Sequence, residues 1–213
     1  MLPITGCRIQ PPPVEEPDDE TPLIDLNDPY LILVNAQNPL PEGFKPELKT
    51  VQGNLQLEVT AADALQEMIA AAKEVGLSLL VVSAYRSPER QAVLYENKVQ
   101  EWIGYGYSRA AAEAKAATIV ALPGTSEHHT GLAADIVTPD YQRLNAGFAE
   151  TAAAKWMANY AHRYGFILRY PEDKEEVTGI IFEPWHFRYV GKEHAKAIQE
   201  SGLSLEEYLD QGR

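Results

Sequence analysis

The 213-residue sequence has very little cysteine and few basic side chains. Its single cysteine, Cys7, excludes an internal disulfide and any metal site built from several thiolates. The 18 lysines and arginines stand against 31 aspartates and glutamates, which leaves a net charge of −13. So acidic a chain cannot neutralise phosphates, and this argues against a nucleic-acid partner and against docking onto an anionic membrane.

Long apolar runs and internal repeats are also absent from the sequence. No stretch of eighteen apolar residues could cross a membrane as a helix. The length suits one well-buried domain rather than two. We therefore expect one domain, over residues 28–213, and a monomer.

Residues 1–27 differ in composition from the rest of the chain. Three consecutive prolines, at 11–13, precede a cluster of acidic residues at 15–20. Low apolar content and like charges predict an extended or disordered linker here. No signal peptide is visible before Cys7, yet residues 4–7 (ITGC) resemble the end of a bacterial lipoprotein cleavage site. The hypothesis is a lipid anchor on Cys7 of a longer precursor, and the alternative is an ordinary N-terminal tail.

Beyond this linker, short apolar segments alternate with patterns of helical period. Strands are predicted at 31–34, 55–59, 77–83, 132–137, 166–170 and 180–189, the last two forming a hairpin. Helices are predicted at 61–75, 88–102, 108–120, 148–164 and 192–201, with a final one after a capping box at Ser204 and Glu207. Thr60 and Ser87 are the predicted caps of the first two helices. This order indicates an α+β domain with a small, mainly antiparallel sheet flanked by helices.

Two segments contain polar side chains that a packed core has little use for. They are residues 126–135 (SEHHTGLAAD) and 183–186 (EPWH). Two imidazoles and one carboxylate are a donor set that catalytic zinc takes while a fourth position stays open for water. We predict one Zn²⁺ per chain, held by His128, Asp135 and His186. Glu183 supplies the remaining carboxylate and is the predicted general base.

The first segment is not expected to form one helix. Gly131 interrupts any helix between His128 and Asp135, so a loop followed by a strand fits the spacing better. Alternating side chains on that strand place Ala133 beside Asp135, which leaves room for a metal. His129 is the rival ligand to its neighbour.

The second segment poses a geometric problem. Glu183 and His186 lie on opposite faces of a regular strand, and an aromatic run favours a strand here. Pro184 argues against an interior helix. Both side chains can therefore reach one metal only if the chain bends near Pro184.

These motifs also carry a resemblance to a known family. Ser-x-His-x-x-Gly-x-Ala-x-Asp followed by Glu-x-Trp-His resembles the signature of VanY-type D-alanyl-D-alanine carboxypeptidases, zinc peptidases of the lysostaphin/D-Ala-D-Ala carboxypeptidase/hedgehog superfamily. Further similarity lies at 35–41 (NAQNPLP), 83–87 (SAYRS) and 164–171 (YGFILRYP), and the resemblance covers about residues 30–200. It implies the same α+β fold, the same three zinc ligands and the same base.

The resemblance extends to the substrate pocket. The family pattern has an Arg and a Gln at the separation of Arg86 and Gln91, lining that pocket. We assign Arg86 to the scissile carbonyl or its oxyanion, and Gln91 with Ser126 to substrate binding. The alternative for Arg86 is a surface or salt-bridged residue.

The activity that the resemblance implies is removal of the C-terminal D-alanine from peptidoglycan stem peptides. Such an enzyme would act in the extracytoplasmic bacterial cell envelope, although a cytoplasmic location stays open. The same machinery would suit an L,D-carboxypeptidase or a D-Ala-D-Ala dipeptidase, because no residue in the sequence identifies the stereochemistry. A zinc-stabilised cell-wall-binding module without activity is a further alternative, against which Glu183 argues.

Overall fold

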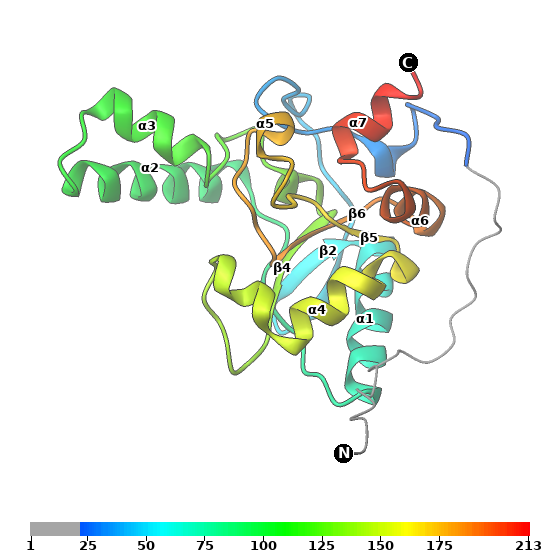
Figure 1. The fold of residues 1–213 in the computed structure, drawn as a ribbon. Helices are drawn as coiled ribbons and strands as arrows, with labels where there is room; N and C mark the ends of the chain where they lie inside the picture. Colours follow the sequence, from blue (N-terminus) through cyan, green and yellow to red (C-terminus); the bar gives the residue numbers. More distant parts are fainter. Residues whose placement is uncertain (1–21) are drawn as a thin grey trace.

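The computed structural model describes residues 22–213 (Figure 1). Cys7 and most of the predicted linker lie outside the described residues, so the linker and anchor hypotheses stay predictions. Within residues 22–213, no helix combines the length and the apolar character that a membrane-spanning segment needs.

A four-stranded sheet lies at the centre of the fold, with the strand order β3–β4–β6–β5. Its strands are β3 (Leu80–Ser83), β4 (Ala133–Val137), β6 (His186–Tyr189) and β5 (Phe166–Leu168). All neighbouring strands are antiparallel. A separate antiparallel pair is formed by β1 (Leu48–Gln52) and β2 (Leu55–Glu58). The predicted α+β class with small antiparallel sheets is confirmed.

Helices surround this sheet unevenly (Figure 1). Helices α1 (Val59–Glu74) and α4 (Ala152–Tyr160) lie together at one side of the sheet, while α2 (Pro88–Gly104) and α3 (Arg109–Ala117) form a hairpin that projects from the body. The short α5 (Glu175–Thr178), α6 (Lys192–Ser201) and α7 (Leu205–Asp210) complete the described helices. The predicted helix caps at Ser87 and at Ser204–Glu207 are both present.

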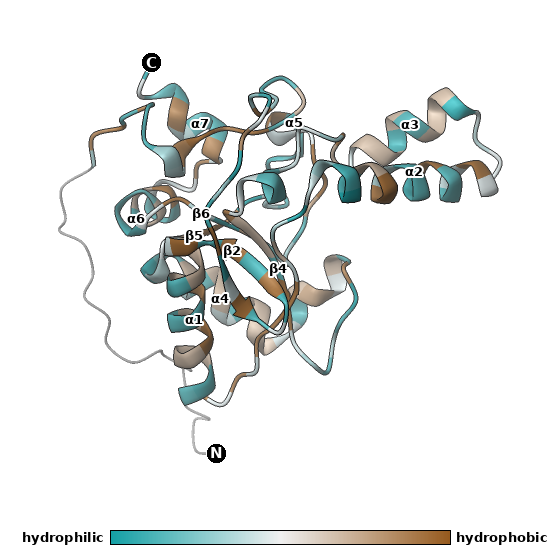
Figure 2. Ribbon diagram, turned by 180° about the vertical axis from the view of Figure 1, so that it is seen from behind, coloured by the Kyte–Doolittle hydropathy of each residue, from teal (hydrophilic) through white to brown (hydrophobic). Residues whose placement is uncertain are grey.

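The pleat of the sheet decides which side chains enter the main core. Ala134 and Ile136 of β4 are fully buried, and they pack in one cluster with Leu65 and Met68 of α1 and with Phe187 of β6. Residues of opposite parity on β4 and β6 point to the other face of the sheet. Figure 2 shows hydrophobic residues in the central strands, whereas α1 and α2 each alternate hydrophilic with hydrophobic residues and α6 is largely hydrophilic.

Four local predictions were wrong. The strand predicted at 31–34 is absent: Pro29–Leu31 form a 3-10 turn, because the Asp28 carboxylate accepts a hydrogen bond from the Tyr30 amide (2.8 Å). The apolar residues at 31–34 indicate that this segment is buried, but they do not indicate the type of secondary structure. Helix α1 begins two residues earlier than predicted, because the Glu58 side chain, and not Thr60, accepts the first amide hydrogen bonds.

The helix predicted at 148–164 is divided into three pieces. A 3-10 segment, Ala146–Glu150, precedes α4, and another, Ala161–Tyr164, follows it. Thr151 causes the first break, since its backbone is extended and its hydroxyl caps α4 by accepting from the Ala154 amide (3.1 Å). The strand predicted at 180–189 is also too long, because only its last four residues, β6, form a regular strand.

Candidate metal centre and active site

His128 is carried by a short 3-10 helix, Glu127–Thr130, that leads into β4. Gly131 ends this helix with φ +72°, and a Cβ atom there would lie 2.8 Å from the Glu58 backbone nitrogen. That nitrogen donates to the Gly131 carbonyl (2.8 Å), which ties the loop to β2. Only glycine suits this position. The predicted strand carrying Asp135 is confirmed, whereas the segment carrying His128, predicted as a loop, is a 3-10 helix.

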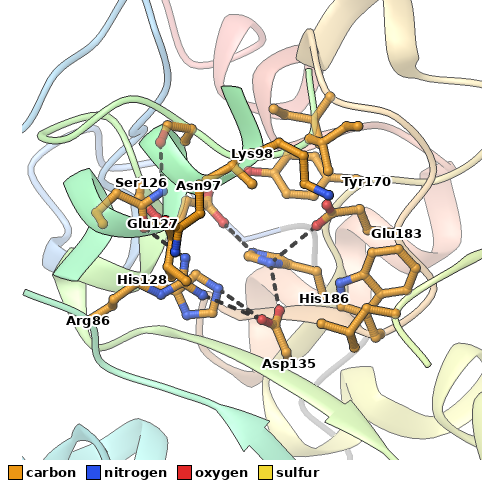
Figure 3. Close-up of a pocket in the computed structure, with 18 of the residues that line it drawn as sticks. Arg86, Asn97, Lys98, Ser126, Glu127, His128, Asp135, Tyr170, Glu183 and His186 are labelled. Atoms are coloured by element: carbon orange, nitrogen blue, oxygen red, sulfur yellow. Dashed lines mark hydrogen bonds and ion pairs between the residues drawn. The ribbon is translucent and has the colours of Figure 1, made fainter. Parts of the chain in front are cut away.

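The three predicted ligands meet at one point (Figure 3). His128, Asp135 and His186 are buried, and each offers a donor atom within 4.8 Å of the other two. Asp135 lies between the rings: its Oδ2 is 3.4 Å from His128 Nε2 and its Oδ1 is 3.1 Å from His186 Nδ1. The register of the sheet explains this, because Asp135 of β4 is paired directly with His186 of β6.

The two imidazoles offer different nitrogens. His128 Nδ1 lies 2.8 Å from the Ala84 carbonyl, so it donates there and leaves Nε2 toward Asp135. His186 is reversed: its Nε2 faces Glu127 Oε2 at 3.3 Å, and its Nδ1 faces Asp135. Hydrogen bonds of this kind fix the tautomer and direction of metal-binding histidines.

His129, the rival ligand, points elsewhere. Its Nδ1 lies 2.6 Å from the Arg86 carbonyl, and its Nε2 accepts from the Gly124 amide (3.1 Å). Both ring nitrogens are thus occupied by the backbone, and within residues 22–213 His129 does not belong to the candidate metal group.

The bend required near Pro184 is present. The His186 amide donates to the Glu183 carbonyl (3.0 Å), which closes a turn just before β6 begins. This turn brings Glu183 Oε2 to 3.6 Å from His186 Nδ1, on the same side as the candidate ligands. Glu183 is buried, and mainly for that reason its pKa rises to about 8, with the Asp135 charge adding to the effect. A carboxylate poised near neutral pH is suited to accept a proton from water.

The charge on Asp135 is supported by its neighbours. Burial by itself would raise the pKa of Asp135, but His128 and His186 outweigh burial and hold the pKa below its usual range. A buried carboxylate that stays ionised is the form in which this side chain binds a metal.

Arg86 extends from the end of β3 to this group. Its Nη2 lies 2.8 Å from Ser83 Oγ and 3.6 Å from Asp135 Oδ2, and its Nη1 donates to Gln91 Oε1 (2.7 Å). The Gln91 amide nitrogen donates in turn to the Ala121 carbonyl (2.6 Å). Gln91 therefore holds Arg86 in place, and direct substrate contact by Gln91 stays a prediction.

A cavity of about 390 Å³ opens over these residues (Figure 3). Arg86, Gln91, Ser126 and the candidate ligands form one part of its lining, and substrate binding by these side chains stays a prediction. Another part comes from α2, through Leu94, Asn97, Lys98 and Glu101. The volume is in the usual range for a small-molecule or peptide-end site.

Glu127 is the site residue that sequence reasoning missed. An acidic side chain in a predicted loop is expected to be exposed to solvent, yet the Glu127 side chain is fully buried. The available signal was a pair of arginines in otherwise apolar segments, Arg169 and Arg188, since buried arginines require a buried anion. Both contact Glu127.

Comparison with known proteins assigns this geometry to a family. A family model described as "VanY: D-alanyl-D-alanine carboxypeptidase" matches residues 54–192. The chain belongs to the VanY family. The resemblance that the sequence motifs suggested is thereby confirmed.

Individual relatives agree with the VanY assignment. A D-alanyl-D-alanine carboxypeptidase of Enterococcus faecalis (strain ATCC 700802 / V583) is 44% identical over 180 residues, which cover 84% of this chain. The chain spans 65% of that relative's length, just under two thirds. Putative carboxypeptidase YodJ of Bacillus subtilis (strain 168) is 43% identical over 191 residues, covering 84% of this chain and 67% of the relative.

Solved structures share the fold over nearly their whole length. VanYB in complex with D-alanine-D-alanine superposes with a TM-score of 0.79 and 41% identity, covering 86% of this chain and 99% of the other. A mutant of the VanY D,D-pentapeptidase from a VanB-type resistance cassette, in complex with Zn(II), superposes with a TM-score of 0.78 and 42% identity. The match covers 85% of this chain and 99% of the other. The LdcB LD-carboxypeptidase superposes with a TM-score of 0.76 and 40% identity, and the match covers 94% of each chain.

Proposed function

We propose that this chain is a zinc-dependent D,D-carboxypeptidase that removes the C-terminal D-alanine from peptidoglycan stem peptides. The observation that carries the proposal is the meeting of His128, Asp135 and His186 beside Glu183 at the cavity. VanY relatives with zinc and with D-Ala-D-Ala support the metal and the substrate class.

The donor set fits zinc on its own chemistry. Two imidazole nitrogens and one carboxylate within 4.8 Å of one another are the three protein ligands of a catalytic zinc site. The hydrogen bonds to Ala84 and Glu127 direct His128 Nε2 and His186 Nδ1 toward Asp135, so the three donor atoms face one point.

Around such an ion, the chain's own residues divide the work. When bound, zinc supplies a Lewis acid that polarises a carbonyl and acidifies a water molecule. Glu183 accepts the proton of the attacking water and passes it to the leaving amine as the C–N bond breaks, a role worth about 10²–10⁴-fold. Arg86, held by Ser83 and Gln91, stabilises the negative charge that develops on the scissile carbonyl oxygen.

The pocket must also accept the free carboxylate of the substrate. Asp135 and Glu183 would repel that anion unless donors lie nearby to offset them. Arg86 and Ser126 line the same cavity and supply such donors. A donor set arranged for a carboxylate rejects analogues that lack it, because its polar groups are then left unpaired.

Amidating the C-terminal D-alanine of a stem pentapeptide is expected to abolish cleavage for this reason. The acid and the amide are incubated separately with the enzyme, and the released products are identified by mass spectrometry. A change at the far, amino-terminal end of the peptide is the control and should matter much less. Equal cleavage of acid and amide would make this chain an endopeptidase.

The bond that is cut is decided by the same assay with four substrates. Pentapeptide, tetrapeptide, tripeptide and free D-Ala-D-Ala distinguish D,D-carboxypeptidase, L,D-carboxypeptidase and dipeptidase activities by the product released. No hydrolysis of any of them by the zinc-loaded protein would favour a binding module instead.

The substrate class also bears on location and assembly. We infer action outside the cytoplasm, in the bacterial cell envelope, because the stem peptide is part of the cell wall. Lipid anchoring through Cys7, a domain start near residue 28 and a monomeric state remain proposals, testable by a Cys7→Ala variant, limited proteolysis and light scattering.

Stability of the metal-free protein should fall as the pH rises from 7 to 9. Burial alone lowers the pKa of His186, but hydrogen bonds to Asp135 and Glu127 outweigh it and raise the pKa to about 9. The pKa of Glu183 is raised to about 8. Both pKa values lie above the ordinary values of 6.5 for histidine and 4.5 for glutamate. The folded state therefore binds more protons than the unfolded state. The stability that these two groups contribute to the folded state is fully present at pH values below the ordinary pKa values. It is lost as the pH rises through the folded-state pKa values of about 8 and about 9.

Melting temperatures of chelator-stripped and zinc-loaded protein at pH 7, 8 and 9 check this. Zinc needs the deprotonated ring of His186, so the rise in melting temperature on zinc loading should increase with pH. Glu183→Gln is the matched variant. It should reduce the fall in the metal-free melting temperature between pH 7 and 9 but not abolish it, because His186 still titrates. A metal-free melting temperature that is constant or rises over this range would contradict the prediction.

A further inference from the structure

We propose that Glu127 is a positioning residue of the metal centre, whose carboxylate fixes His186 with Nε2 as the donor and Nδ1 turned toward the metal. The inference rests on the zinc site proposed above. The hydrogen-bond partners of the Glu127 carboxylate within residues 22–213 are Arg169, Arg188 and His186, so His186 is the one candidate ligand among them.

The Glu127 carboxylate is divided between two tasks. Its Oε1 accepts from Arg169 Nε (2.7 Å) and from Arg188 Nη1 (2.8 Å). Its Oε2 lies 3.3 Å from His186 Nε2, and Figure 3 shows this contact on the side of the ring away from Asp135. The side chains of Glu127, Arg169 and Arg188 are all 0% exposed, so water cannot replace any of these partners.

The two arginines are themselves fixed from remote parts of the chain. Arg169 makes a two-pronged contact with the Glu206 carboxylate of α7 (2.6 and 2.8 Å). Arg188 donates through Nη2 to the Tyr30 and Ile32 carbonyls (3.0 and 2.8 Å). The Glu127 carboxylate therefore cannot rotate without breaking contacts to both arginines.

A network of this kind is poorly explained by stability alone. Removing four charged groups from water is costly, and well-packed apolar residues would often stabilise the same space as well or better. The network has two positive and two negative side chains, so it carries no net charge of its own. Its one unshared contact, from Oε2, is aimed at a candidate ligand, which is where outer-shell carboxylates act on metal-bound histidines.

His186 needs such a partner, whereas His128 does not depend on one. The backbone carbonyl of Ala84 already directs His128. For His186, the nitrogen on the far side of the ring from Asp135, Nε2, has the Glu127 carboxylate as its hydrogen-bond partner within residues 22–213. Without an acceptor there, the ring proton is favoured on Nδ1, next to Asp135, and Nδ1 is then blocked as a ligand.

Glu127→Gln tests this with almost no change of shape. Arg169 and Arg188 will bind the amide oxygen, which turns the amide NH₂ toward His186 Nε2 and reverses the direction of that hydrogen bond. Zinc affinity, measured by competition with a chromophoric chelator, is expected to weaken about 10–100-fold, as for other outer-shell partners. In zinc-loaded protein the protected His186 Nε2–H signal in ¹⁵N-edited NMR should be lost.

Glu127→Asp covers the case in which the glutamine variant does not fold. It keeps the negative charge for the arginines but withdraws the carboxylate from His186, so a folded protein with weaker zinc binding is expected. Glu207→Gln is the matched control, because Glu207 adjoins Glu206 on α7 but contacts Ser204 and Lys174 instead. Its zinc affinity and NMR signal should equal those of the wild type.

The outcomes separate this inference from the proposed function. If the wild type binds no zinc, the metal centre itself is wrong and the role of Glu127 falls with it. If the wild type binds zinc and a folded Glu127 variant binds it as tightly, with the Nε2–H signal retained, only this inference is overturned. Failure of both variants to fold would assign Glu127 to stability and would also overturn it.

Discussion

Glu183→Gln is expected to leave zinc bound and to reduce turnover by about 10²-fold or more. Glutamine keeps the length and the hydrogen-bonding reach of glutamate but cannot accept a proton. Glu183 lies 3.6 Å from His186 Nδ1, beside the three candidate ligands and not among them. The change should therefore remove the base without removing the metal, and kcat should fall far more than zinc content.

The measurement is kcat on stem pentapeptide together with zinc content by elemental analysis. Glu172→Gln is a suitable control, because this glutamate is exposed in the same connection between β5 and β6. It should change neither quantity. Full activity of the Glu183→Gln protein would mean that another group takes the proton from water.

His128→Ala and His186→Ala are each expected to abolish zinc binding. The wild type should carry about one zinc per chain, and each variant removes one of the three proposed protein ligands. Activity on stem peptides should disappear with the metal. Elemental analysis after dialysis against a mild chelator measures the zinc directly.

His129→Ala is the matched control for the ligand variants. It removes a neighbouring, largely buried imidazole that also makes two hydrogen bonds, but to the backbone of Arg86 and Gly124. Some loss of melting temperature is expected, with zinc retained. Full zinc content in both His128→Ala and His186→Ala would remove the ligand assignment.

Much of the site could be predicted from the sequence because its chemistry is local. Two imidazoles and two carboxylates in short motifs around a glycine define a donor set whatever the fold, and those motifs also indicated the VanY family. Helix caps such as Ser87 were predictable for the same reason, since a cap depends on the few residues that follow it.

Apolar patterns did not predict the course of the backbone in two segments. The composition of residues 31–34 favours a strand, yet within residues 22–213 no strand pairs with them, and Leu31 and Val34 are buried without one. The long helix predicted at 148–164 was interrupted by a competing cap at Thr151. In both cases the periodicity reported which side chains are buried and not how the backbone runs.

The sequence by itself therefore determined the donor types, the family and the need for a bend near Pro184. Only the tertiary structure decided which nitrogen each histidine presents, that His129 is turned to the backbone, and that Gln91 holds Arg86. It alone joined Glu127 to Arg169 and Arg188. The physical reason is that hydrogen-bond direction depends on partners brought by strands remote in sequence, and a single chain read in order does not contain their positions.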